Sequence, residues 1–477
     1  MLAERVGSRV PLLLAAALGA GSLLCVRQAR DAYVDDASDV NDVSGGMAFA
    51  PVAVHIKIAS PRLATPQFNL VAATTRLEPE VEDGIVMSVE PLFTELGALD
   101  ADDRSRWVRV LTPSRLAADV LVARLKADDG VEQVFVAPEV GLATSDAATA
   151  PAVADDSCPI NTPSFESYQG YLGPAPHGID APAAWRRGQR GAGVWFADIE
   201  GGWNAEHEDL PGDRIKHVGG TKFKDPAWRA HGTAVLGEVV GRDNGKGVVG
   251  IAPDVERVFT SSIGGTTVAN AIDVAAKNLR AGDVLLIELQ GGGPRGRWLP
   301  VEFWDDNYDA IAAATKRGVV VIEAAGNGGE NLDHKEYKQK FDRAKRDSGA
   351  IMVGAGGPPR GGWADRERLD FSNFGGRVDV QGWGRKVATL DYGDLQACAG
   401  ADRHYTGEFS GTSSASPIVA GAAVIVQGVA KTRGTLLTPV QIRTLLRDTG
   451  TPQLGDTSEQ IGPRPDLERA ITALERR

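Results

Sequence analysis

The feature that most constrains the fold of this 477-residue chain is an alternation of apolar strand-like segments with helical patterns in its second half. The sequence predicts strands at residues 194–198, 283–289, 319–323 and 351–354, and helices at 268–279, 308–316, 418–429 and 438–447. Near-continuous apolar strands separated by helices predict an α/β fold with a doubly wound, mostly parallel sheet that is covered on both faces. In such sheets ligands bind beyond the carboxyl ends of the strands, so functional residues are expected there.

A second, smaller domain is predicted ahead of this sheet. Segments rich in β-branched residues at 52–58, 85–89, 107–111 and 131–136 are combined with a helical pattern at 114–128. This mixture predicts a small α+β domain of ferredoxin-like type over residues 51–142. Residues 143–157 contain few bulky side chains, which is typical of an exposed and cleavable connection. A linker is therefore expected at 143–177, followed by the sheet domain at 178–477.

The N-terminus has the charged-then-apolar order of a secretory signal. Arg5 and Arg9 precede an apolar stretch at 11–24, which is shorter than the roughly 20 residues of a membrane span. Residues 1–30 are therefore interpreted as a signal peptide or N-terminal anchor, and the alternative is a buried N-terminal helix. The acidic segment 31–50 is interpreted as a linker. These features predict a secreted or periplasmic protein, with anchoring through an uncleaved N-terminus or a lipidated Cys25 as the alternative.

The acidic charge balance argues against two classes of partner, nucleic acids and anionic membrane surfaces. The chain has 51 Lys and Arg against 63 Asp and Glu, for a formal net charge of −12. Binding to nucleic acid or to an anionic membrane surface requires a basic surface, so neither is expected. The three cysteines are too few for a disulfide scaffold. If Cys25 leaves with the signal, Cys158 and Cys398 remain as an even pair, and a disulfide between them is a hypothesis.

Four polar residues fall where a parallel sheet would place a site. Ser413 precedes an apolar helix, where free N–H groups and the helix dipole favour a developing negative charge. A serine hydroxyl needs a base, and His231 is neutral enough at pH 7 to serve. Asp198 at a strand end would orient the imidazole. The Asn327 amide and the Ser413 N–H group would stabilise a tetrahedral oxyanion. Any one of these signals alone is more often structural, whereas the four together favour catalysis.

The motifs around these residues resemble those of the subtilisin-like serine proteases, the subtilases. They are G-V-W-F-A-D, H-E-D-L, H-G-T-A-V-L-G, N-G-K-G-V-V-G-I-A-P, V-V-V-I-E-A-A-G-N-G, D-F-S-N-F-G and G-T-S-S-A-S-P-I-V-A-G. The resemblance extends from about residue 178 to the C-terminus. It implies a catalytic triad of Asp198, His231 and Ser413, with Asn327 as oxyanion donor. It also implies hydrolysis of protein or peptide substrates through an acyl-enzyme, with no cofactor needed for catalysis.

Residues 51–142 similarly resemble the propeptide of subtilases, by pattern rather than by motif. The resemblance implies a zymogen in which this domain inhibits the enzyme in the same chain and helps it to fold. Self-cleavage is then expected within residues 143–157.

The sequence departs from the family at several positions. Family members follow the catalytic Asp with a small residue and Gly, whereas Asp198 is followed by Ile199 and Glu200. The segment that borders the substrate in relatives is here Glu288, Leu289, Gln290 and Gly291. A carboxylate from Glu288 or Glu323 in the specificity pocket would favour substrates with Lys or Arg. The alternative is that both carboxylates are paired internally.

Two further expectations follow from the resemblance. Asp209 and Asn244 align with a calcium site of many relatives, and carboxylate and amide oxygens suit that cation. An ordinary turn is the alternative. The competing function is a catalytically silent, subtilase-like binding protein. An α/β-hydrolase is disfavoured because the serine would then have to precede the acid and the histidine.

Overall fold

A computed structural model of the protein describes residues 50–60, 64–96, 102–144, 159–398 and 400–476. The predictions on the signal, the acidic linker, Cys25 and Cys158 lie outside these residues. Within them the chain forms two compact units. One comprises Leu70–Glu90 and Val108–Ala137 with the described residues up to Ala59. The other comprises Ser60–Asn69, Pro91–Trp107 and Pro138–Arg477. The predicted domain limits of 51–142 and 178–477 stay predictions.

The first unit is built on a four-stranded sheet in the order β2-β3-β1-β4. Its strands are β1 (Val52–Ile58), β2 (Ser88–Pro91), β3 (Trp107–Thr112) and β4 (Val131–Val136), and β1 pairs with β4 in antiparallel fashion. The helices α2 (Pro66–Arg76), α3 (Glu78–Glu82) and α4 (Arg115–Leu125) accompany it. Apolar side chains from β1, β3 and α4 form one buried cluster, which gives this unit its own core.

The second unit contains the predicted doubly wound sheet. Its seven strands lie in the order β14-β13-β12-β9-β6-β8-β7, and every neighbouring pair is parallel. They are β6 (Phe196–Glu200), β7 (Ile215–Gly219), β8 (Val258–Ser262), β9 (Val284–Ile287), β12 (Val320–Ala324), β13 (Ile351–Gly356) and β14 (Val380–Trp383). The strand order reverses between β6 and β9. That switch point is where a ligand site is expected in such a sheet.

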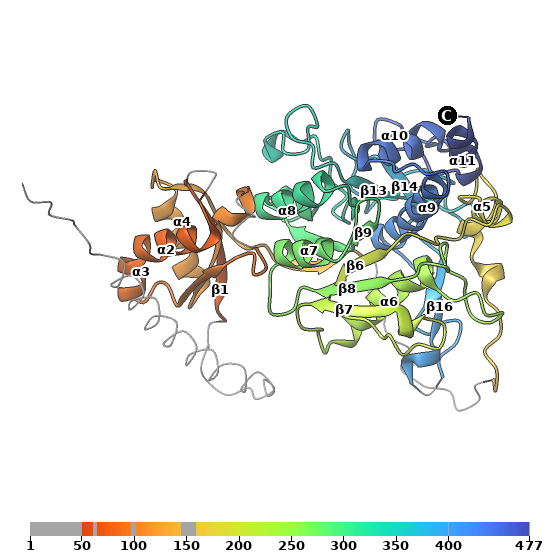
Figure 1. Cartoon of the computed structure of the whole chain (residues 1–477), viewed down its shortest axis with the longest axis horizontal. Coiled ribbons are helices and arrows are strands. Elements are labelled where there is room, and N and C mark those ends of the chain that lie inside the picture. The colour runs from red at the N-terminus through yellow and green to blue at the C-terminus, as the bar shows by residue number, and fades with distance from the viewer. Residues whose placement is uncertain (1–49, 61–63, 97–101, 145–158, 399, 477) are drawn as a thin grey trace, which may run out of the picture. The chain divides into compact units, whose positions relative to one another are not determined.

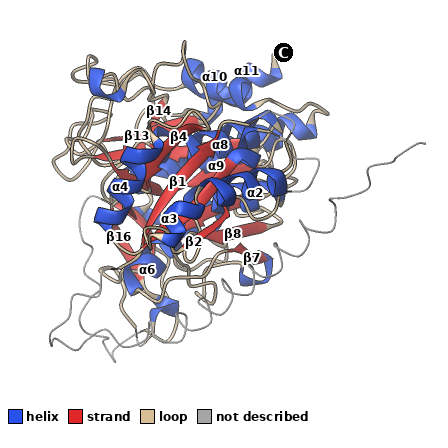
Figure 2. Ribbon diagram, turned by 90° about the vertical axis from the view of Figure 1, so that its left-hand side faces the viewer, coloured by secondary structure: helices blue, strands red, loops and turns tan. Residues whose placement is uncertain are grey.

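Helices cover both faces of this sheet (Figures 1 and 2). On one face α6 (Pro226–Val240) packs against α9 (Thr412–Thr432), and α9 crosses β9, β12, β13 and β14. On the other, α7 (Val268–Lys277) packs against α8 (Asp305–Lys316) and against the sheet. The remaining α-helices of this unit are α5 (Ala181–Arg186), α10 (Pro439–Thr449) and α11 (Leu467–Glu475). The fold class predicted from the sequence is therefore confirmed.

Helix α9 is long and apolar enough to cross a membrane, but the relevant stretch is buried completely inside the protein. No other helix in the described part of the chain meets that test. Full burial by neighbouring strands and helices explains why α9 is apolar on all sides.

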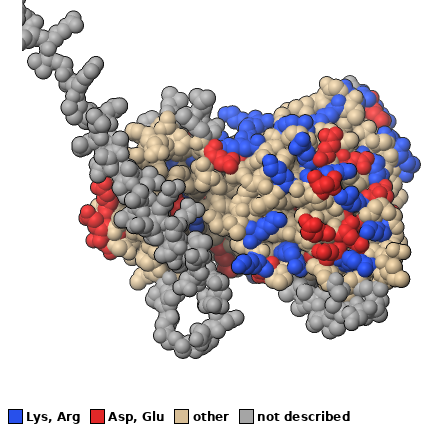
Figure 3. Space-filling model, turned by 60° about the horizontal axis from the view of Figure 1, so that its bottom comes forward, with Lys and Arg blue, Asp and Glu red and all other residues tan. Residues whose placement is uncertain are grey.

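Two small sheets complete the second unit. One has the order β11-β10-β5, from β5 (Val140–Leu142), β10 (Leu289–Gly292) and β11 (Trp298–Pro300). The other pairs β15 (Val387–Leu390) with β16 (Tyr405–Phe409). On the face drawn in Figure 3, basic and acidic side chains are interspersed over the surface.

Candidate active site

Ser413 lies in the first turn of α9, two residues after a glycine with positive φ. Gly411 has a φ of 110°, a conformation that favours glycine, and the helix begins at Thr412. Ser413 is buried, and its Oγ makes no hydrogen bond to any described residue. The hydroxyl therefore lies at a helix N-terminus and is not held in a hydrogen bond to a described residue, as a nucleophile requires.

His231 lies in α6 and is also fully buried. Its Nδ1 forms a hydrogen bond with Oε1 of Glu200, whereas its Nε2 has no partner among the described residues. Burial lowers the pKa of His231 to about 3, and the negative charge of Asp198 acts in the opposite direction. The imidazole is therefore neutral at pH 7. With its Nδ1 proton directed at Glu200, Nε2 is the atom that can accept a proton.

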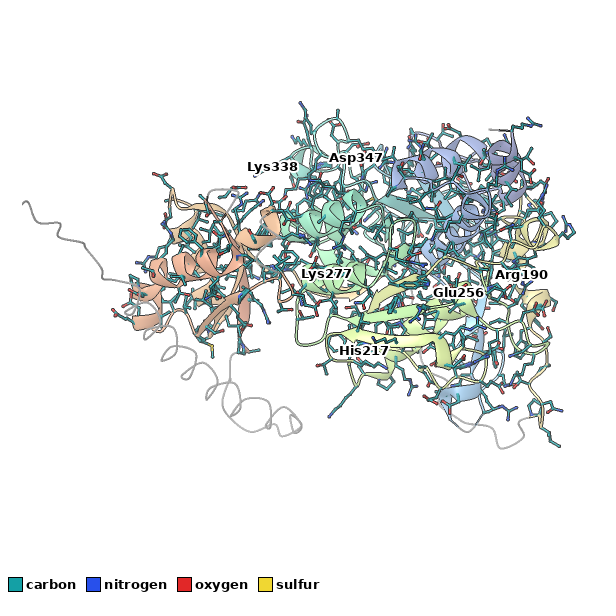
Figure 4. All side chains as sticks on the ribbon, viewed as in Figure 1. Arg190, His217, Glu256, Lys277, Lys338 and Asp347 are labelled. Atoms are coloured by element: carbon teal, nitrogen blue, oxygen red, sulfur yellow. The ribbon has the colours of Figure 1, made fainter. Side chains whose placement is uncertain are left out.

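The structure thus corrects the predicted contact between Asp198 and His231. The strand β6 continues two residues beyond its predicted end, so the carboxylate at its carboxyl end is Glu200. The side chain of Asp198 instead accepts a hydrogen bond of 2.7 Å from Nε1 of Trp203. The indole of Trp203 packs against the ring of His217, which Figure 4 labels on β7. Both acidic residues are fully buried, and burial raises the pKa of each.

A sequence signal for Glu200 was present. Gly201 and Gly202 follow it directly, and small residues after the acid are what the family pattern requires. The apolar run 194–197 ends at Asp198, so the sequence predicted that this first carboxylate, rather than Glu200, marks the end of the strand.

Asn327 follows β12. The oxygen of its side-chain amide accepts hydrogen bonds, whereas the nitrogen makes none to a described residue. Its Oδ1 accepts hydrogen bonds of 2.9 Å from both the backbone N–H and the hydroxyl of Thr412. Its Nδ2 is buried and has no partner in the described residues. The contacts of Oδ1 identify Nδ2 as the unpaired donor, which suits an oxyanion close to the N-terminus of α9.

An extended segment of the same unit lies beside these groups. The strand β5 pairs antiparallel with β10, with Leu142 opposite Leu289 and Val140 opposite Gly291. The carbonyl of Leu142 accepts a hydrogen bond of 2.6 Å from Nε2 of Gln290. The next carbonyl, that of Ala143, accepts one of 3.1 Å from the backbone N–H of Ser413. A peptide carbonyl is therefore held at the backbone donor expected for the oxyanion.

Comparison with known proteins identifies the family. The model of the subtilase family matches residues 152–463, which is more than half of the chain. The protein is a subtilase. It is 32% identical to subtilisin DY of Bacillus licheniformis over 58% of this chain and 91% of that protein. It is 27% identical to the major intracellular serine protease of Bacillus subtilis over 52% and 73%.

Solved structures agree on the fold. This subtilase matches the epidermin leader peptide processing serine protease of Staphylococcus aureus with a TM-score of 0.57 and 16% identity, over 90% of this chain and 99% of the other. It matches a protease of Pseudoalteromonas arctica with a TM-score of 0.50 and 22% identity, over 66% and 99%. Family membership makes the protein a serine endopeptidase that requires no cofactor for catalysis.

Glu288 and Glu323, which were predicted to line a pocket for Lys or Arg side chains, are both fully buried in this subtilase. Oε1 of Glu323 accepts a hydrogen bond of 2.8 Å from the backbone N–H of Glu302. Glu302 in turn forms an ion pair of 2.6 Å with buried Arg377. Glu323 therefore belongs to an internal polar network. Glu288 is buried near Glu200 and Asp198, which raise its pKa, and a preference for Lys or Arg in the substrate stays a prediction.

The residues proposed for calcium are bonded to each other. Asn244 Nδ2 donates to Asp209 Oδ1 at 2.8 Å, and the backbone N–H of Val248 donates to Oδ2 at 2.8 Å. Each carboxylate oxygen thus accepts one hydrogen bond within the protein, as expected for an ordinary turn, and calcium binding stays a prediction. Among the described residues, no group of three or more His, Cys, Asp and Glu side chains is arranged to hold a metal ion. Cys398 is buried, and its pairing with Cys158 stays a prediction.

Proposed function

We propose that this subtilase is an exported zymogen that cuts its own chain between Ala143 and Thr144. The observation that carries the proposal is the carbonyl of Ala143, which lies 3.1 Å from the backbone nitrogen of Ser413. The preceding residues Val140–Leu142 are paired with β10 as an added strand. An extended peptide held in this way is the usual geometry of a bound protease substrate.

The chemistry of the cut follows from the atoms at the site. His231 Nε2 takes the proton of Ser413 Oγ as the oxygen attacks the carbonyl carbon of Ala143. The carbonyl electron pair moves to its oxygen, where the Ser413 N–H and Asn327 Nδ2 donate hydrogen bonds. When the tetrahedral intermediate collapses, the C–N bond breaks and His231 gives the proton to the leaving amine of Thr144. Water then hydrolyses the acyl-enzyme and frees the carboxylate of Ala143.

Glu200 has the third role in this proposal. Its contact with Nδ1 orients the imidazole and stabilises the positive charge that His231 carries after taking the proton of Ser413. The proposed triad is therefore Glu200, His231 and Ser413, with Asn327 as the side-chain oxyanion donor.

Other peptide substrates would use the same edge of β10. Once the chain is cut, residues up to Ala143 form the product side of the cleft and act as an inhibitor until they leave. The proposal that the protein is exported is based on the apolar segment 11–24. The protein would then be secreted or periplasmic, and the alternative is that its N-terminus anchors it to the membrane. A disulfide between Cys158 and Cys398 would lie wholly within the mature chain.

The test compares the purified wild type with Ser413→Ala. The wild type should yield a mature chain whose first residue is Thr144, with peptide hydrolysis that a serine-directed phosphonate abolishes. The variant should remain full length and inactive. A processed variant would overturn self-cleavage, and a new N-terminus at another residue would overturn the assignment of the bond.

A further inference from the structure

Glu288 is a buried acid that the proposed mechanism does not use. It joins β9 to β10 at the carboxyl edge of the sheet, and its side chain is fully buried. Neither of its carboxyl oxygens makes a hydrogen bond to any described residue. Buried polar groups without a partner are uncommon, and an ionised carboxylate in that state is very costly. The group therefore requires an explanation.

The groups that most affect the pKa of Glu288 come from two elements. From β6 these are the carboxyl groups of Glu200 and Asp198, and from α9 the hydroxyls of Ser416 and Ser413. On α6 lies a further fully buried acid, Glu238, whose pKa is raised by its own burial and by Glu288, and which has no hydrogen-bond partner in the described residues. No Lys or Arg is among the groups that most affect Glu288 in the described structure.

Four buried carboxyl groups in one region cannot all be ionised, because like charges repel strongly where water is absent. Burial raises the pKa of Glu288 well above its ordinary value, and the charges of Glu200 and Asp198 raise it further. The Ser416 and Ser413 hydroxyls act in the opposite direction. Glu200 is the carboxyl group that contacts His231 and thus gains most from being charged.

Both hydroxyls next to Glu288 lower its pKa, but that of Ser416 can also pair with the neutral carboxyl group. Ser416 Oγ donates its proton to the carbonyl of Thr412 at 2.6 Å, so what it can offer Glu288 is a lone pair. A protonated carboxyl group can donate to that lone pair. An ionised one can only accept, and the free hydroxyl that remains near it is that of Ser413.

We propose that Glu288 is protonated in the working enzyme, donates to Ser416, and sets the alkaline limit of activity when it ionises. This inference rests on the proposed catalytic function. The ionised group would accept the hydroxyl proton of Ser413, which turns that hydroxyl away from His231. It would also place a second negative charge near Glu200 and the developing oxyanion. Glu288 is thus a positioning residue for the nucleophile.

The test is the pH dependence of kcat/KM for wild type, Glu288→Gln and Glu238→Gln, measured with an uncharged chromogenic peptide. Wild type should lose about tenfold or more on the alkaline side, and Glu288→Gln should stay within about twofold there because its amide cannot ionise. Glu238→Gln is the matched control, since it removes another buried carboxyl group that makes no hydrogen bond to a described residue and lies outside the proposed triad, and it should keep the alkaline fall. Thermal melting at each pH separates loss of activity from unfolding.

Three outcomes would overturn the inference: no alkaline fall in wild type, an unchanged fall in Glu288→Gln, or Glu288→Gln inactive at every pH although folded. A second readout does not need activity. The infrared C=O stretch of a protonated buried carboxyl group should be present in wild type at neutral pH and reduced in Glu288→Gln. An inactive wild type that shows this difference would refute the proposed function and leave the protonation of Glu288 supported, and an absent difference would refute the protonation itself.

Discussion

At the scale of single residues, the acid that contacts the imidazole of His231 is a glutamate, two positions beyond the aspartate that the sequence suggested. Replacing Glu200 by Gln should lower kcat/KM by about 1000-fold to 10,000-fold, because the amide no longer stabilises a charged imidazole. Asp198→Asn should cost about tenfold or less, since its hydrogen-bond partner is Trp203 and not His231. Peptide hydrolysis by the two mature variants measures both effects. A larger loss for Asp198→Asn than for Glu200→Gln would refute the assignment.

Asn327 supports a second prediction at this scale. Asn327→Ala removes the unpaired Nδ2 donor, and it also removes Oδ1, which accepts hydrogen bonds from the backbone N–H and the hydroxyl of Thr412. Asn327→Ala should lower kcat by about 100-fold to 1000-fold with KM nearly unchanged, because the donor acts only when the oxyanion forms. That magnitude comes from subtilisin, a member of the same family. A rise in KM with kcat unchanged would show that Asn327 binds substrate rather than the transition state.

At the scale of elements, the junction between β16 and α9 leaves room for the substrate chain only because residue 411 is glycine. A Cβ at Gly411 would lie 2.2 Å from the carbonyl oxygen of Ala143 and 2.8 Å from the Cα of Thr144. Gly411→Ala should therefore abolish self-cleavage, seen as a full-length chain by intact mass. Gly434→Ala is the matched control, since Gly434 also has positive φ but has open space around it. Its chain should be processed normally, and processing of Gly411→Ala would contradict the placement of Ala143.

Also at the scale of elements, the period of apolar residues predicted the strands but not where β6 ends. The ladder continues because Glu200 pairs in register with Ser262 of β8, a contact distant in sequence that local pattern cannot reveal. Glu323 shows the same limit. Its position at a strand end suggested a place in the substrate pocket. In the structure it accepts a hydrogen bond from Glu302, which pairs with Arg377, and both residues are remote in sequence. The place of Ser413 in the first turn of a helix depends on local sequence and was predictable, whereas the direction of a strand carboxylate was not.

At the scale of the whole molecule, Asp209 links folding stability to pH. Burial raises its pKa from 3.8 to about 7, and the hydrogen bonds from Val248 and Asn244 oppose this rise only in part. Between these two values the folded state keeps a proton that the unfolded state has lost. The contribution of Asp209 to stability is therefore fully present below pH 3.8 and is lost as the pH rises through about 7.

Asp209→Asn, which cannot ionise, isolates this contribution. Both chains also carry Ser413→Ala, which prevents self-digestion. Between pH 4 and pH 8, the free energy of unfolding of the chain with Asp209 should fall by about 1 to 4 kcal/mol relative to that of the Asp209→Asn chain. Denaturant unfolding at the two pH values measures it. EDTA should leave Tm unchanged at both if Asp209 is held by an ordinary turn, in which Asn244 and Val248 donate to its carboxylate oxygens. A difference that does not vary with pH would refute the linkage, and a Tm that falls in EDTA only when Asp209 is present would establish the calcium site instead.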